Sequence, residues 1–139
     1  MAVILVVNDD AQMLDTYEAV LRDMGHQPVT KVTVASGPET VRDVKADALL
    51  IDLQRADEDE YGVRIIEQLR ADPETRSLPI VLCTGASFQV GPLTRHLEQL
   101  EVPVVLKPFR VDDLQEALTA ALAERASTEP VLEKGVNYG

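Results

Sequence analysis

Four polar side chains in different parts of the sequence each follow a short apolar segment, and their types together suit phosphoryl chemistry. They are Asp9, Asp52, Thr84 and Lys107. A carboxylate such as that of Asp52 can act as a nucleophile towards a phosphoryl group and form an aspartyl-phosphate. Two carboxylates crowded together need a cation, and their hard oxygen atoms suit Mg²⁺. Because an ammonium and a hydroxyl can both donate to phosphoryl oxygens, these four residue types predict a phosphoryl-acceptor site.

The apolar segments that precede these side chains are typical of strands in a buried parallel sheet. Leu49-Leu50-Ile51 is an apolar run without polar alternation, and it ends directly at Asp52. Amphipathic segments alternate with such runs along the chain, which predicts helices on both faces of the sheet. Five strands are expected near residues 2–7, 28–34, 49–52, 80–83 and 102–106, and five helices near residues 11–24, 38–45, 63–71, 89–100 and 111–125.

The expected fold class is α/β, with a flavodoxin-like, doubly wound, five-stranded parallel sheet in the strand order 2-1-3-4-5. In this order the carboxyl ends of strands one, three, four and five lie at the same edge of the sheet. Open α/β sheets bind their ligands at that edge. The topology therefore predicts that Asp9, Asp52, Thr84 and Lys107 share one cleft.

Composition and charge narrow the class of protein. The chain has 139 residues, of which 45% are hydrophobic, and a net charge of −11. The negative charge argues against non-specific binding to nucleic acid or to an anionic membrane surface. No apolar run approaches the length of a membrane span, no signal peptide is evident, and the single Cys83 is expected to be a buried core thiol. These features predict a cytoplasmic protein with one domain over residues 1–125 and a flexible tail over residues 126–139.

The chain resembles the receiver domain of two-component response regulators over about residues 2–125. Four motifs in matching order and spacing carry the resemblance, namely Val6-Val7-Asn8-Asp9-Asp10, Leu49-Leu50-Ile51-Asp52, Pro79-Ile80-Val81-Leu82-Cys83-Thr84-Gly85 and Lys107-Pro108-Phe109. The resemblance implies that the protein accepts a phosphoryl group from a histidine kinase or phosphotransfer protein. The sequence shows no DNA-binding or enzymatic output domain, so a single-domain regulator is expected. Signalling through a downstream protein target, with no enzyme activity beyond self-phosphorylation and dephosphorylation, is expected. We expect neither nucleic-acid nor membrane contact, and a monomer or weak dimer.

The resemblance also implies a role for each site residue, with Mg²⁺ as the cofactor. The implied phosphoacceptor is Asp52. The implied metal ligands are Asp9, Asp52, the backbone carbonyl of Gln54, and Asn8 through a water molecule. Thr84 is the implied switch hydroxyl, Lys107 the implied phosphoryl contact, and Pro108 is expected to follow a cis peptide bond.

Three departures from the family pattern affect these expectations. The first position of the usual acidic pair is Asn8, so one negative charge is lost and weaker Mg²⁺ binding is expected; a shifted pair, Asp9-Asp10, is the alternative. The position where the family usually has a switching aromatic ring is Val104, so we expect gating through Thr84 without a ring flip. The loop after Asp52 is about two residues longer than usual and contains the acidic run 57–60.

Three other functions compete with this interpretation. One is a degenerate receiver that binds partners without phosphorylation, which Asn8 and Val104 favour. A small Mg²⁺-dependent phosphatase of the haloacid dehalogenase type needs a second aspartate two residues after its nucleophile, and Ala11 stands there if Asp9 is the nucleophile. A flavodoxin-like cofactor binder needs a hydroxyl- and glycine-rich phosphate loop after the first strand, which the sequence lacks.

The remaining residues that could do chemistry have simpler interpretations. His26 follows the predicted helix stop Gly25, and His96 belongs to a predicted surface helix, so neither is expected to accept phosphate. Tyr17 and Tyr61 are interpreted as packing or surface residues.

Overall fold

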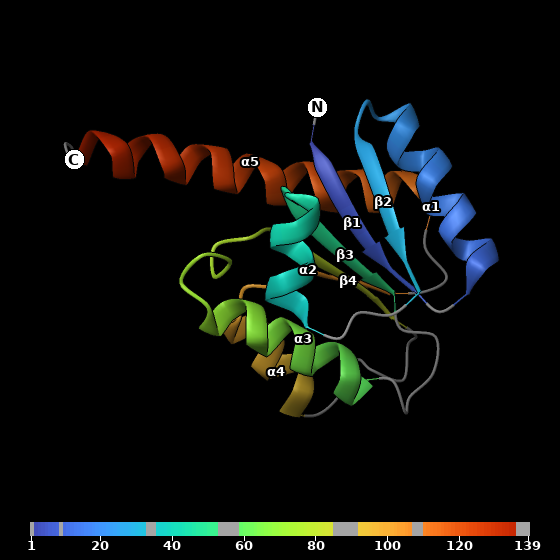
Figure 1. The fold of residues 1–139 in the computed structure, drawn as a ribbon, viewed down its shortest axis with the longest axis horizontal. Helices are drawn as coiled ribbons and strands as arrows, with labels where there is room; N and C mark the ends of the chain where they lie inside the picture. Colours follow the sequence, from blue (N-terminus) through green and yellow to red (C-terminus); the bar gives the residue numbers. More distant parts are fainter. Residues whose placement is uncertain are drawn as a thin grey trace.

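The computed structural model describes residues 2–8, 10–32, 36–52, 59–84, 92–106 and 110–135. These residues form a five-stranded parallel sheet in the order β2-β1-β3-β4-β5, which confirms the predicted flavodoxin-like topology (Figure 1). The strands are β1 (Val3–Val7), β2 (Gln27–Lys31), β3 (Ala48–Asp52), β4 (Ile80–Thr84) and β5 (Val104–Leu106). β3 is buried at every position, as a central strand covered on both faces must be.

Helices cover both faces of this sheet (Figure 1). They are α1 (Ala11–Asp23), α2 (Gly37–Val44), α3 (Asp59–Ala71), α4 (Pro92–Gln99) and α5 (Val111–Gly135). One core cluster joins α2, α3 and α4 to the sheet, with Val41, Ile66 and Leu97 as members. A second cluster joins α1 and α5 to the other face through Leu14 and Leu118. The layers are therefore three helices on one face and two on the other.

Alternation along β3 determines which face carries the side chain of Asp52. Leu49 and Ile51 belong to the core beneath α2, α3 and α4, whereas Ala48 and Leu50 belong to the core beneath α1 and α5. Since successive side chains of a strand point to opposite faces, Asp52 lies on the face of Ala48 and Leu50. The central carboxylate is therefore on the side of the sheet that α1 covers.

Capping groups explain where α1 begins and ends. The Asp10 side chain accepts hydrogen bonds from the backbone N–H groups of Gln12 (2.9 Å) and Met13 (3.4 Å). This satisfies donors that the first turn of a helix leaves open. Gly25 follows the helix at φ 87°, a conformation that glycine adopts without a Cβ penalty. Both predicted boundary residues are confirmed.

Three helix boundaries differ from the sequence prediction. α5 continues to Gly135, whereas its end was predicted near Arg125, so the expected tail begins as helix. Residues 126–135 include good helix formers such as Ala126, Glu129 and Leu132, and the helix continues past Pro130. α3 begins at Asp59 instead of near Val63, which places acidic residues in its first turn, where the helix dipole favours them. α4 begins at Pro92, a residue suited to a first helical turn.

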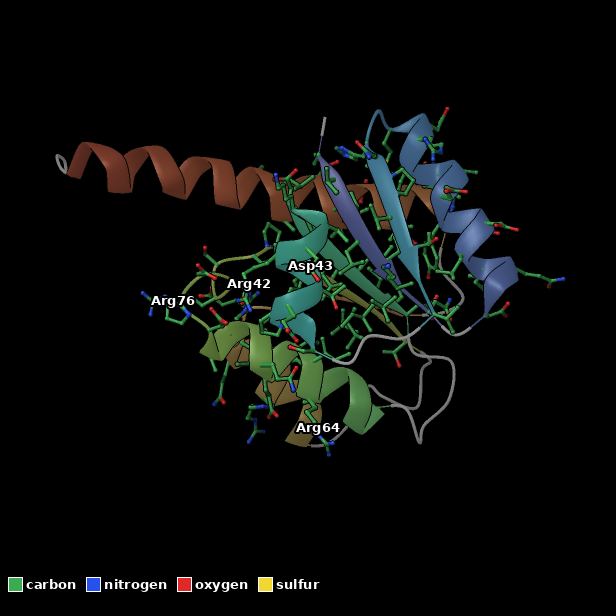
Figure 2. The ribbon with its side chains drawn as sticks, viewed as in Figure 1. Arg42, Asp43, Arg64 and Arg76 are labelled. Carbon is green, nitrogen blue, oxygen red and sulfur yellow. The ribbon has the colours of Figure 1, made fainter. Side chains whose placement is uncertain are left out.

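Ion pairs attach α2 to the segment that follows α3, and Figure 2 labels the Arg42 side chain of α2. The Arg42 guanidinium lies 3.1 Å from Asp72 Oδ2 and 3.2 Å from Glu74 Oε1. The pKa of Asp72 is held below its ordinary value, first by the backbone N–H of Glu74 and then by Arg42. Because these groups are largely exposed, the pairs contribute little stability. In the part of the chain that the structure describes, no helix combines the length and apolar character required to cross a membrane.

His26 is expected to make the stability of the fold depend on pH. Its Nδ1 accepts a hydrogen bond from the backbone N–H of Ala2 (3.2 Å), and burial lowers its pKa below the ordinary value. The unfolded chain therefore takes up a proton more readily than the folded protein, so the free energy of unfolding decreases as the pH falls through about 6.5. Chemical denaturation at pH 7.5 and pH 5.5 measures this loss. We expect His26→Gln to reduce the difference between the two pH values, and an unchanged difference contradicts the assignment.

Candidate functional site

Buried polar side chains gather at the carboxyl ends of three neighbouring strands. Asn8, Asp52 and Thr84 are only 1%, 4% and 3% exposed, and they follow or end β1, β3 and β4. Among the described residues, one further non-aromatic polar side chain is buried, that of Thr75. Its hydroxyl donates to the backbone carbonyl of Leu69 (2.7 Å), which gives it a structural role. The other three are at the sheet edge where the sequence predicted the site.

Strand register places these residues at one edge of the sheet. Val7 of β1 pairs with Ile51 of β3, so the next residues of the two strands, Asn8 and Asp52, follow a paired position. Asp52 itself pairs with Cys83, the residue before Thr84. Thr84 pairs with Leu106, the last residue of β5. The register therefore confirms one shared edge for the polar residues that the structure describes.

Several predicted site residues lie outside the described residues. They are Asp9, Gln54, Lys107 and Pro108. The acidic run over residues 57–60 lies there in part, and its last two residues begin α3. The roles given to these residues stay predictions.

The carboxylate of Asp52 accepts a hydrogen bond from a residue of α1. The hydroxyl of Tyr17 donates to Asp52 Oδ2. Tyr17 is 1% exposed and belongs to the core cluster beneath α1 and α5, together with Cys83. Burial raises the pKa of Tyr17 far above its ordinary value, and the adjacent Cys83 and Asp52 raise it further. Tyr17 is therefore a neutral hydrogen-bond donor at any physiological pH.

The sequence interpretation of Tyr17 as a packing residue was incomplete. Tyr17 does pack in the core, but its hydroxyl contacts the side chain predicted to carry the chemistry. A signal was present, because Tyr17 stands on the inward face of its helix with Leu14 and Leu21. A tyrosine buried at such a position needs a hydrogen-bond partner. What the helical pattern alone could not provide was the identity of that partner, 35 residues away in the chain.

Asn8 links the end of β1 to the start of α1. Its backbone N–H donates to the carbonyl of Lys31 (3.1 Å), which continues the pairing between β1 and β2. Its Oδ1 accepts a hydrogen bond from the backbone N–H of Asp10 (3.0 Å). This turn is closed by the side chain of Asn8 itself, as short polar side chains commonly do. The amide is thereby fixed beside the end of the central strand.

The described part of the site offers oxygen atoms of the type that Mg²⁺ prefers. The carboxylate of Asp52 and the amide oxygen of Asn8 are hard donors. No group of three or more His, Cys, Asp or Glu side chains stands together among the described residues, and the predicted ligand Asp9 lies outside them. A hollow of about 460 Å³ is lined by residues of α2 and the end of α3, such as Pro38 and Gln68, and not by the strand-end residues. The donor set fits a magnesium ion by chemical type.

Comparison with known protein families agrees with this arrangement. Residues 4–119 match the model of the response regulator receiver domain. The chain belongs to this family. The resemblance drawn from the four sequence motifs is thereby confirmed, and the chain has both the fold and the family membership of a receiver domain.

Curated relatives of this receiver domain are longer proteins. The transcriptional regulatory protein PrrA of Mycobacterium bovis is 27% identical over 136 residues, which cover 98% of this chain and 56% of PrrA. The DNA-binding response regulator MtrA of Mycolicibacterium paratuberculosis is 30% identical over 127 residues, which cover 91% of this chain and 53% of MtrA. The chain therefore spans about half the length of these relatives.

A solved structure is similar over nearly its whole length. It is the receiver domain of the sensor histidine kinase PA1611 from Pseudomonas aeruginosa PAO1, with a magnesium ion coordinated in its active-site cleft. The two chains are 28% identical with a TM-score of 0.64, and the match covers 88% of this chain and 98% of the other.

Proposed function

We propose that this receiver domain accepts a phosphoryl group on Asp52 from a histidine kinase or phosphotransfer protein. The observation that carries the proposal is the buried carboxylate of Asp52 at the carboxyl end of the central strand, beside Asn8 and Thr84. Membership of the receiver family gives this position its chemical meaning. The donor is a phosphorylated histidine side chain, as expected for proteins that supply this family.

The transfer requires Asp52 to act as a nucleophile. One carboxylate oxygen forms a bond to phosphorus while the bond between phosphorus and the donor imidazole nitrogen breaks, and the electron pair of that bond leaves with the imidazole. Burial of Asp52 excludes water from the reacting oxygen. When bound, a magnesium ion neutralises charge on the phosphoryl oxygens. The residues that would hold the ion are Asp52, Asp9, Gln54 through its backbone carbonyl, and Asn8 through a water molecule.

Thr84 and Lys107 are the proposed contacts of the transferred group. A phosphoryl group adds nearly two negative charges and strong acceptor oxygens to Asp52. Thr84 is buried and is the last residue of β4, the strand that pairs with the strand of Asp52. Val104 is partly buried against the core beneath α2, α3 and α4, and it has no ring to move. The output is therefore a change around Thr84 that a downstream protein target senses.

The proposal also covers the partners, location and oligomeric state of the protein. The net charge of −11 disfavours direct contact with nucleic acid or an anionic membrane. We propose a cytoplasmic protein, a monomer or weak dimer, that turns over only its own aspartyl-phosphate.

Phosphoryl acceptance is tested by incubation with acetyl phosphate and Mg²⁺ followed by intact mass measurement. We expect an added phosphoryl group, which EDTA prevents; no adduct under saturating conditions contradicts the proposal.

A degenerate receiver that binds partners without phosphorylation is the second candidate. The observation in its favour is that Asn8, directly after β1, has a neutral amide where the family usually has a carboxylate. Binding of a partner with equal affinity before and after treatment with acetyl phosphate would favour this candidate, because a ligand shifts an equilibrium only through differential affinity.

Asn8→Asp is expected to tighten Mg²⁺ binding by roughly tenfold, because ligand charge is a main determinant of affinity at oxygen sites. The added carboxylate also lies near Asp52, so repulsion is expected to lower the stability of the metal-free protein. Mg²⁺ titration and thermal denaturation, each with and without metal, measure the two effects. Gln27→Glu is the control, since it adds the same charge at the exposed start of β2. Equal affinity in all three proteins contradicts the expectation.

A further inference from the structure

We infer that Tyr17 is a positioning residue that holds the Asp52 carboxylate in a resting orientation and slows its phosphorylation. The inference rests on the proposed role of Asp52 as acceptor. Its basis is the hydrogen bond from the Tyr17 hydroxyl to Asp52 Oδ2, which reaches the acceptor from the core and not from the open edge of the sheet.

The fold places the Tyr17 hydroxyl next to the Asp52 carboxylate. Tyr17 lies on the inward face of α1, between Leu14 and Leu21, and all three are buried. Asp52 is on the face of β3 that α1 covers, because every second residue of a strand lies on the same face and Ala48 and Leu50 lie on that face. The tyrosine ring therefore packs in the core while its hydroxyl meets the carboxylate at the end of the strand.

The hydrogen bond occupies an oxygen that the acceptor reaction needs. A carboxylate that forms an acyl-phosphate uses one oxygen for the bond to phosphorus and presents the other to the cation. Donation by Tyr17 draws charge from Oδ2 and directs that oxygen towards the core. Bond formation to phosphorus and binding of the cation therefore both compete with the tyrosine hydroxyl for the Asp52 carboxylate.

Burial makes this competition effective. Tyr17 is 1% exposed and Asp52 is 4% exposed, so water cannot readily replace either partner. If Asp52 turns away, the tyrosine hydroxyl exchanges a charged acceptor for the neighbouring Cys83 thiol, which is a weak acceptor, and this exchange is unfavourable.

Tyr17→Phe tests the inference because it removes the hydroxyl and keeps the ring. We expect the rate of adduct formation with acetyl phosphate to rise about tenfold, together with tighter Mg²⁺ binding measured by titration without phosphodonor. Tyr17→Met, which also lacks the hydroxyl, is expected to change both quantities in the same direction. Thr75→Val is the matched control, since it removes a buried hydroxyl that bonds to Leu69 away from the site.

The outcomes separate this inference from the proposed function. A faster rate and tighter Mg²⁺ binding in both Tyr17 variants, but not in Thr75→Val, support it, since a loss of stability alone would affect the control as well. A wild-type adduct that forms at the same rate or faster than in the Tyr17 variants overturns the inference and leaves Asp52 as acceptor. No adduct in any of the proteins overturns the proposed function and this inference with it.

Discussion

Asp52→Asn is expected to abolish the phosphoryl adduct that acetyl phosphate and Mg²⁺ produce. The substitution replaces the nucleophilic carboxylate by an amide of nearly the same shape, which cannot form an acyl-phosphate. It also keeps an oxygen that can accept the hydrogen bond from Tyr17, so the fold is expected to survive. Intact mass measurement after a fixed incubation compares the variant with the wild type.

Asp47→Asn is the matched control for this prediction. Asp47 precedes the opposite end of the same strand, where its Oδ2 accepts a hydrogen bond from the backbone N–H of Val3 (2.8 Å). The control therefore removes one carboxylate next to β3 but leaves the proposed acceptor intact. We expect a wild-type adduct in Asp47→Asn. An undiminished adduct in Asp52→Asn would assign the acceptor to another residue.

Arg70→Met is expected to lower the free energy of unfolding by about 3 kcal/mol, since hydrogen bonds from a charged group contribute more than neutral ones. The guanidinium of Arg70, near the end of α3, donates to the carbonyls of Leu100 (2.8 Å), Arg76 (3.0 Å) and Leu78 (2.7 Å). Leu78 leads into β4, and Leu100 leads towards β5. The side chain of Arg70 therefore holds in place the two segments that lead into β4 and β5. Thr84 ends β4, and Lys107 follows β5 in the sequence.

The control for this prediction is Arg76→Met. The Arg76 side chain is exposed and lies at the outer edge of the segment after α3 (Figure 2), and only its backbone carbonyl takes part in the contact with Arg70. Urea denaturation measures both variants. We expect a change within about 0.5 kcal/mol for Arg76→Met, as is usual for surface substitutions. A similarly small change for Arg70→Met shows that water replaces its hydrogen bonds without cost.

The fold was predictable because local patterns and topology agree in this chain. Apolar runs such as Leu49–Ile51 are too short for helices and are separated by amphipathic segments, which leaves few arrangements other than a doubly wound sheet. The position of Asp52 at the end of the central strand followed from the same pattern. Its neighbours Asn8 and Thr84 were predictable because parallel strands present their carboxyl ends at one edge.

Contacts between distant residues were not predictable from local patterns. Tyr17 looked like a core residue because helical periodicity gives the face of a side chain, but not the group that its polar end will meet. The end of α5 was misplaced because Pro130 and the residues around it resemble a tail, whereas the helix continues to Gly135. For Asp9, Gln54, Lys107 and Pro108, which lie outside the described residues, the roles rest on the family motifs alone.

The measurement that tests the central claim most directly is chemical identification of the phosphorylated residue. Borohydride reduction of the protein after treatment with acetyl phosphate and Mg²⁺ converts an aspartyl-phosphate to homoserine, and fragment mass spectrometry locates the altered residue. We predict a single altered position, Asp52. A modification at another residue, or none under conditions that label a known receiver domain in parallel, would contradict the assignment of Asp52 as the phosphoryl acceptor.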